Sequence, residues 1–179
     1  KGEITDENGK SLNQKEIDEI EVLMDSATMA SNAEIHSPDE EHNTWYPIGD
    51  PTEAALITMS TKIGTRSPTE DEENPELQEF PFDSKRKRMS SVRQFGEDIA
   101  LTVKGSTLGV LSITKYIYKN GKKVAITEED IKKIKKRNED YSKNGLRVLA
   151  VARRDLPKKK DYTQDEVEKD VTFLGLIAM

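Results

Sequence analysis

A chain of 179 residues fits one domain and is long enough to bury a core of its own. Its 34 acidic residues outnumber its 28 basic ones, and the resulting net charge of −6 argues against a general nucleic-acid binder. There is no cysteine, which excludes a disulfide framework, and no apolar run reaches the roughly 18 residues that would span a bilayer.

The first predicted element is a helix behind a tight turn. Asn8-Gly9 is typical of such a turn, so a short hairpin is expected ahead of the helix. Apolar residues at helical spacing predict a helix over about residues 13–31, and Ser11 and Gln14 have the spacing of a capping box at its start. Residues 32–48 are polar, contain both histidines and are predicted to form a loop.

A second helix is predicted over about residues 51–62. Asp50 suits the N-cap, Pro51 the first helical position and Glu53 the third, a combination typical of a helix start. The acidic residues 65–75, which include proline, are expected to form another loop.

From residue 76 onward the pattern changes to strands and short helices. Strands are predicted at about residues 77–82, 88–94, 98–104, 146–154 and 171–178. Between them we expect a helical turn at 106–112, a hairpin at 113–125 around Asn120-Gly121, a Lys-rich helix at 128–142 capped by Thr127 with Asp130, and a loop at 156–169. Strands and helices do not alternate regularly, so the predicted fold class is α+β, with a mainly antiparallel sheet flanked by helices.

The sequence lacks the usual cradles for phosphate. There is no Walker-type loop and no dinucleotide-binding GxGxxG motif, and a GxSxG nucleophile elbow is also missing. Two histidines without cysteine argue against a zinc site. A nucleotide, if one binds, would be held by base stacking and by scattered cations.

Two segments could serve that purpose or a structural one. Phe82 could stack on a base at a strand end, or it could face the core as Phe80 does two positions earlier. Residues 85–88 (KRKR) could be a solvated strand edge. Strand alternation would put Lys85 and Lys87 on one face, with Arg86 and Arg88 on the other.

Other candidates have similar alternatives. Lys104 could pack its methylenes beside a planar ring, and Gly105 could let a ligand approach the backbone. Alternatively, the two are an ordinary strand-end lysine and turn glycine. Glu53 could belong to the helix start or face a cleft, or do both. Arg147 is expected on the face opposite Leu146, either solvated or in a site, and on the same face as Leu149.

Five segments in fixed order resemble the nucleotide-binding domain of P-type cation pumps, in the bacterial form of the calcium-type branch. They are residues 49–56 (GDPTEAAL), 80–90 (FPFDSKRKRMS), 103–105 (VKG), 145–150 (GLRVLA) and 173–179 (FLGLIAM). Each motif alone is weak, and the resemblance depends on their order and spacing.

The resemblance implies a set of nucleotide-binding residues: Thr52, Glu53, Phe82, Lys87, Lys104, Gly105, Arg147 and Leu149. By this resemblance the Phe82 ring stacks on adenine, Lys104 lines the inner end of the adenine pocket, and Glu53 accepts from the adenine amino group near Thr52. Lys87 lies beside the nucleotide as a charge for phosphate. Arg147 lies at the phosphate or ribose end, and Leu149 packs on the base side.

The chain departs from the family pattern at two places. Ser84 stands where some calcium pumps have an arginine that reaches the phosphates, and Lys85 or Arg86 is the candidate to replace it. Residues 106–108 (STL) follow Gly105 in place of the usual Ala-Pro-Glu.

The resemblance also implies what surrounds the chain. Residues 1–179 are expected to be a single nucleotide-binding domain excised from a larger membrane pump, with the phosphorylation and actuator domains of the same parent chain as partners. The domain would bind ATP, as Mg-ATP in the full pump, and position it for an aspartate on a separate domain. It would have no catalytic residue, no metal ligand, no nucleic-acid partner and no membrane contact of its own. Its location would be the cytoplasmic side of an integral membrane protein, in the plasma membrane if bacterial.

Two other functions stay open from the residues alone. One is a protein-interaction module without a nucleotide, in which the acidic loops and the Lys-rich helix at 128–142 would dock a partner. The other is an RNA-binding domain that uses residues 85–88, although the acidic total and the few aromatic residues on those strands argue against it.

Overall fold

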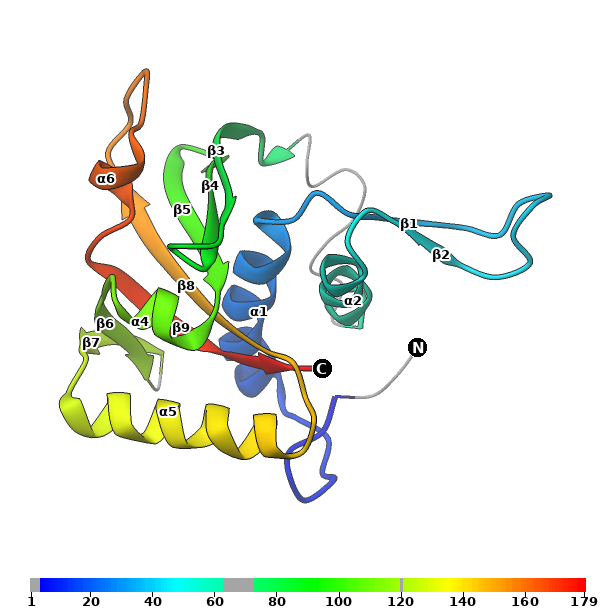
Figure 1. The fold of residues 1–179 in the computed structure, drawn as a ribbon, viewed down its shortest axis with the longest axis horizontal. Helices are drawn as coiled ribbons and strands as arrows, with labels where there is room; N and C mark the ends of the chain where they lie inside the picture. Colours follow the sequence, from blue (N-terminus) through cyan, green and yellow to red (C-terminus); the bar gives the residue numbers. More distant parts are fainter. Residues whose placement is uncertain (1–3, 63–72, 120) are drawn as a thin grey trace.

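A computed structural model describes residues 4–62, 73–119 and 121–179 of the chain. Its centre is a seven-stranded sheet in the order β3-β4-β5-β8-β9-β6-β7 (Figure 1). Neighbouring strands are antiparallel except β6 and β9, which are parallel. The strands are β3 (Glu76–Asp83), β4 (Arg88–Phe95), β5 (Asp98–Gly105), β6 (Thr114–Lys119), β7 (Lys122–Ala125), β8 (Val148–Leu156) and β9 (Val171–Ala178).

Helices cover both faces of this sheet. They are α1 (Gln14–Met29), α2 (Pro51–Ser60), α4 (Thr107–Leu111), α5 (Glu128–Lys143) and α6 (Gln164–Val167). On β8 the alternation of side chains separates two cores. Ala150 and Ala152 belong to the core that includes residues of α4, α5 and α6, whereas Val151 belongs to the core that includes residues of α1 and α2. The predicted α+β class with a mainly antiparallel sheet is therefore confirmed.

Local signals account for most element boundaries. Thr127 caps α5 in a capping box with Asp130, and Gly145, just past its end, has a φ of 78°. The predicted hairpin is present as β6 and β7, with Lys119 paired to Lys122. Asn120 of its turn lies outside the described residues, as do residues 63–72, which take in most of the loop predicted at 65–75.

The start of α1 differs from the prediction. The N-cap is Asn13 rather than Ser11, because the Asn13 side chain accepts from the Glu16 N–H while the Glu16 carboxylate accepts from the Asn13 N–H. Ser11 instead forms an antiparallel bridge with Thr5 across the predicted tight turn.

The loop prediction for residues 32–48 is wrong in part. Strands β1 (Glu34–His36) and β2 (Tyr46–Ile48) form a small antiparallel sheet, which extends away from the main body as a hairpin (Figure 1). The Asp39 carboxylate accepts a hydrogen bond from the Tyr46 hydroxyl at 2.6 Å and from the His42 backbone N–H at 2.8 Å, and these bonds link the two arms. The predicted loop at 156–169 likewise contains the short helix α6.

No helix in the described ranges is both long and apolar enough to cross a membrane.

Candidate functional site

A cleft of about 690 Å³ opens at the edge of the sheet where β3 and β5 end and β4 and β8 begin. This volume is in the usual range for small-molecule sites. The residues that follow α1 and those that begin α2 close it on one side. All eight residues predicted to bind a nucleotide line this one cleft: Thr52, Glu53, Phe82, Lys87, Lys104, Gly105, Arg147 and Leu149.

The start of α2 presents its side chains to the cleft. As predicted, Asp50 is the N-cap: its carboxylate accepts from the backbone N–H of Thr52 at 2.8 Å and of Glu53 at 3.2 Å, and Pro51 occupies the first turn. Hydrogen bonding from the Thr52 side chain lowers the pKa of the Asp50 carboxyl, with smaller contributions from the two backbone N–H groups and the charge of Arg147. The N-cap is therefore a fixed negative charge at the rim.

Glu53 and Lys104 form a buried ion pair in the wall of the cleft. The Lys104 ammonium lies 2.8 Å from the Glu53 carboxylate and donates to the Ser31 hydroxyl at 2.5 Å, and the Lys104 side chain is only 6% exposed. The other Glu53 oxygen accepts from the Asn32 backbone N–H at 2.9 Å. This pair connects β5, α2 and the segment after α1. A carboxylate has about four acceptor positions, so Glu53 retains capacity for a further donor.

Phe82 is exposed, so the interpretation of its ring as a core residue is wrong. The residue is 63% accessible, whereas Phe80 packs against the main core. The strand pairing explains the difference. Phe80 pairs with Ser90 and Asp83 with Arg88, and this irregularity breaks the simple alternation that would place both rings on one face. A large aromatic surface is thereby left free at the cleft.

Residues 84–87 form a turn between β3 and β4, so the prediction that residues 85–88 alternate along a strand is wrong. The Asp83 carboxylate accepts from the backbone N–H groups of Lys85 and Arg86, both at 2.9 Å, and these bonds lower the pKa of Asp83. The Lys87 N–H donates to the Asp83 carbonyl at 2.6 Å, and Lys87 has the left-handed φ of 53°. Ser84 and Lys87 line the cleft.

The expected replacement for the missing arginine at Ser84 is not found. Neither Lys85 nor Arg86 lines the cleft. The Arg86 guanidinium is committed elsewhere: it donates to Glu168 at 2.5 Å and to the Pro81 carbonyl at 2.7 Å. Ser84 therefore lines the cleft without a nearby arginine from its own turn.

Gly105 lines the cleft and is also required by the packing of the neighbouring strand. A Cβ at this position would lie 2.4 Å from the Lys87 carbonyl oxygen and 2.6 Å from the Arg88 Cα, because the backbone of β4 runs directly beside it. Only glycine fits there without moving the β3–β4 turn. The next residue, Ser106, caps α4 by accepting from the Gly109 N–H at 3.1 Å, so the STL departure still forms a helical turn.

Arg147 and Leu149 enter the cleft from the start of β8. The strand begins at Val148 rather than at residue 146, and Leu146 is 37% exposed. Arg147 is nonetheless held in place, because its backbone N–H and carbonyl pair with Met179 at 2.8 and 2.9 Å. Leu149 packs against the core shared by α1 and α2.

The positive charges available to a ligand are those of Lys87 and Arg147. Within the described ranges neither side chain lies within 4 Å of a carboxylate, whereas the third lysine or arginine of the cleft, Lys104, is paired with Glu53. No three histidine or acidic side chains in the described part of the chain are grouped to hold a metal ion.

Among the residues of the cleft wall that sequence reasoning missed are Asn32 and Glu79. Asn32 donates from its amide nitrogen to the Glu79 carboxylate at 2.9 Å, which joins the segment after α1 to β3. The two residues are 47 positions apart and belong to no recognised motif, so no local signal marked them.

Comparisons with known proteins identify the family of the chain. The family model for the P-type ATPase cytoplasmic domain N matches residues 19–179. A calcium-transporting ATPase of Listeria monocytogenes is 34% identical over 88% of this chain, and calcium-transporting ATPase 1 of Lactococcus lactis is 38% identical over 74%. Sodium/potassium exporting P-type ATPase 1 of Saccharomyces cerevisiae is 30% identical over 92%.

The matched parts are small shares of these relatives. The chain covers 17% of the Listeria protein, 15% of the Lactococcus protein and 18% of the yeast protein. The predicted resemblance is confirmed: the chain belongs to the P-type ATPase family, in which it corresponds to the cytoplasmic domain N.

Proposed function

We propose that this domain binds ATP in the cleft at the sheet edge and positions it for transfer of the γ-phosphate to an aspartate on a separate domain of a calcium-type cation pump. The observation that carries the proposal is the convergence of eight residues from distant motifs on one cleft of about 690 Å³. An exposed aromatic ring at a strand end can hold a base, and two cations that are not ion-paired within the described residues can hold its phosphates, without a Gly-rich loop.

In this proposal the two ends of the cleft have different tasks. The Phe82 ring stacks on adenine, and the apolar Leu149 packs on the base side. The paired Lys104 and Glu53 form the inner wall, where Glu53 accepts from the exocyclic amino group. Lys87 and Arg147 supply the positive charge for the phosphates.

The contribution to catalysis would be positioning. The side chains of the cleft bring a bound nucleotide to a defined orientation, and the domain breaks no bond itself. In the parent pump the nucleotide would be Mg-ATP, and the partners would be the phosphorylation and actuator domains. The parent would be an integral membrane protein with this domain on the cytoplasmic side, in the plasma membrane of a bacterium.

The commitment of the arginines argues against RNA binding. Arg86 and Arg88 both donate to the buried Glu168, so half of the basic run at 85–88 faces into the protein. That leaves a cleft with a mixed charge rather than a continuous basic stripe.

An amide chemical-shift titration with ATP and with adenosine tests the proposal. We expect a Kd of about 0.1–1 mM for ATP, which corresponds to about 4–5.5 kcal/mol. The shifted amides should be those of the cleft. A protein-interaction module without a ligand would show no saturable shift, and that result would refute the proposal. Phosphate release should not exceed a no-protein control, because the acceptor aspartate would lie on another domain.

A further inference from the structure

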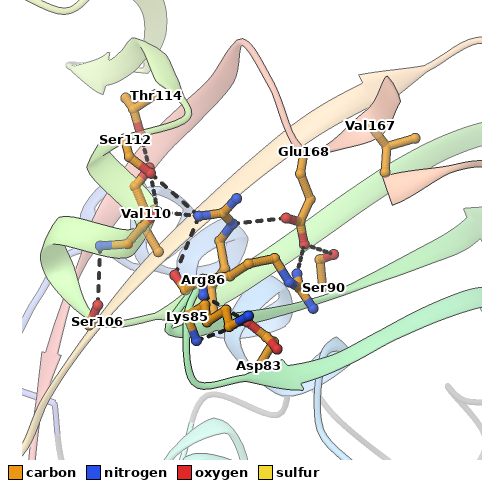
Figure 2. A network of polar contacts seen from close by, with 12 residues as sticks. Asp83, Lys85, Arg86, Ser90, Ser106, Val110, Ser112, Thr114, Val167 and Glu168 are labelled. Carbon is orange, nitrogen blue, oxygen red and sulfur yellow. Dashed lines mark hydrogen bonds and ion pairs between the residues drawn. The ribbon is translucent and has the colours of Figure 1, made fainter. Parts of the chain in front are cut away.

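The β3–β4 turn, which carries Lys87 into the cleft, is held from behind by one buried carboxylate. Glu168, the C-cap residue of α6, has a side chain that is 2% exposed. It accepts from the Arg86 guanidinium at 2.5 Å, from Arg88 Nε at 2.9 Å and from the Ser90 hydroxyl at 2.8 Å. Figure 2 shows Arg86 and Ser90 converging on this carboxylate.

The two arginines extend the network to both sides of the turn. Arg86 also donates to the Pro81 carbonyl at 2.7 Å, next to Phe82. Arg88 also donates to the Gly109 carbonyl at 3.0 Å, so α4 is included. Glu168 and Gly109 do not line the cleft, whereas Pro81 does, so the network holds the turn from the cleft wall and from outside it.

Once these contacts are made, the backbone of the turn has little conformational freedom. Lys87 has a left-handed φ of 53°, a conformation that a lysine adopts only when its surroundings enforce it. The Lys87 carbonyl accepts from the Ser106 N–H at 2.8 Å and lies against Gly105 with no room for a side chain. Arg86 is paired with Glu168 and does not line the cleft, whereas its neighbour Lys87 does.

We infer that Glu168 is a positioning residue of the nucleotide site: it sets the turn that presents Lys87 to the phosphates, although it does not line the cleft. The inference rests on the proposed function. The two arginine side chains are part-buried around a carboxylate that is 2% exposed, and such ion pairs add little net stability compared with apolar packing. We therefore assign this network to the geometry of the turn. Loss of the carboxylate charge should release Arg86 and let the turn relax.

Glu168→Gln tests this role, because it keeps the volume of the side chain and removes the charge. We expect ATP to bind about 5- to 10-fold more weakly, whereas the affinity for adenosine changes less than about 2-fold. Lys87→Ala should lose less affinity for ATP in the Glu168→Gln background than in the wild-type protein, because Lys87 is already displaced there. Equal effects of Lys87→Ala in both backgrounds would overturn the inference.

Asp130→Asn is the matched control. Asp130 is also a buried carboxylate that pairs with a cation, Lys119, but it lies at the start of α5 and does not line the cleft. It should lower the melting temperature without changing the ratio of ATP to adenosine affinity. If Glu168→Gln behaves in the same way, its role is only structural and the inference fails.

The ligand-free protein separates this inference from the proposed function. In Glu168→Gln, and to a lesser degree in Arg86→Lys, the amide resonances of residues 84–88 should shift, whereas Asp130→Asn should leave them unchanged. Unmoved turn resonances in a folded Glu168→Gln, or in Arg86→Lys if the first variant does not fold, would overturn the positioning role even if ATP binds. Absence of ATP binding by the wild-type chain would instead refute the proposed function.

Discussion

Phe82→Ala should separate ligand binding from folding in a single substitution. Phe82 is 63% accessible, so a little over a third of its surface is buried. Full burial of such a side chain stabilises a protein by about 1.5–3 kcal/mol, so truncation should lower the free energy of unfolding by about 1 kcal/mol or less. For a domain of this size that is a fall of about 2–4 °C in melting temperature.

The effect on binding should be larger. Base stacking on an aromatic ring contributes about 1–3 kcal/mol, so Phe82→Ala should weaken ATP and adenosine alike by about 5- to 150-fold. Isothermal calorimetry gives the affinities, and differential scanning calorimetry of the same samples gives the stability.

Phe80→Ala is the matched control, because the same truncation removes a ring that packs against the core. Phe80→Ala should lower the free energy of unfolding by about 3 kcal/mol. The molecules that remain folded should bind ATP with an affinity close to that of the wild-type protein. A Phe82→Ala variant that binds ATP normally, or that unfolds as readily as Phe80→Ala, would refute the assignment of Phe82 to the site.

Three further predictions concern charge. Lys104→Ala should weaken adenosine as much as ATP because this lysine lies in the inner wall, whereas Arg147→Ala should weaken ATP and spare adenosine; competition titrations distinguish the two patterns. Hydrogen bonds from the side chains of Lys119 and Thr127 lower the pKa of Asp130 to about 2, below its value in the unfolded chain. The ionised carboxylate therefore stabilises the fold fully above about pH 4, and this contribution is lost as the pH falls through 2. The stability difference between wild type and Asp130→Asn should therefore shrink on acidification, and a constant difference in urea titrations across that range would contradict the assignment. Magnesium should change ATP affinity little, because no group of three histidine or acidic side chains in the described ranges is placed to hold it; submicromolar binding that requires the metal would exclude this picture.

The sequence was informative where the determinants are local. Asp50 with Pro51 marked the start of α2, and Thr127 with Asp130 marked the start of α5, because helix caps act within one turn. The long strands β3, β4, β5, β8 and β9 were also predicted close to their observed bounds. β1 and β2 were missed because three residues each are too few to show a period of two, and their pairing depends on contacts across the hairpin such as that between Asp39 and Tyr46.

The parts of the site that were missed depend on partners far along the chain. Nothing near residues 85–88 indicates that Arg86 will bind Glu168, 82 positions away, and without that contact a strand was the natural interpretation. The link between Asn32 and Glu79 is of the same kind. The resemblance to a family identified which residues gather at the cleft, but it gave no reason for the left-handed turn at Lys87.

The order of strands has a consequence for folding kinetics. β5 lies between β4 and β8, and the pairing of Gly105 with Ala150 closes a loop of some 45 residues beside the cleft. Before that closure the motifs of β3, β5 and β8 are separate stretches of chain and do not form a binding site. Saturating ATP should therefore slow unfolding of the native domain and leave the folding rate from denaturant nearly unchanged, a division that stopped-flow chevron plots would measure.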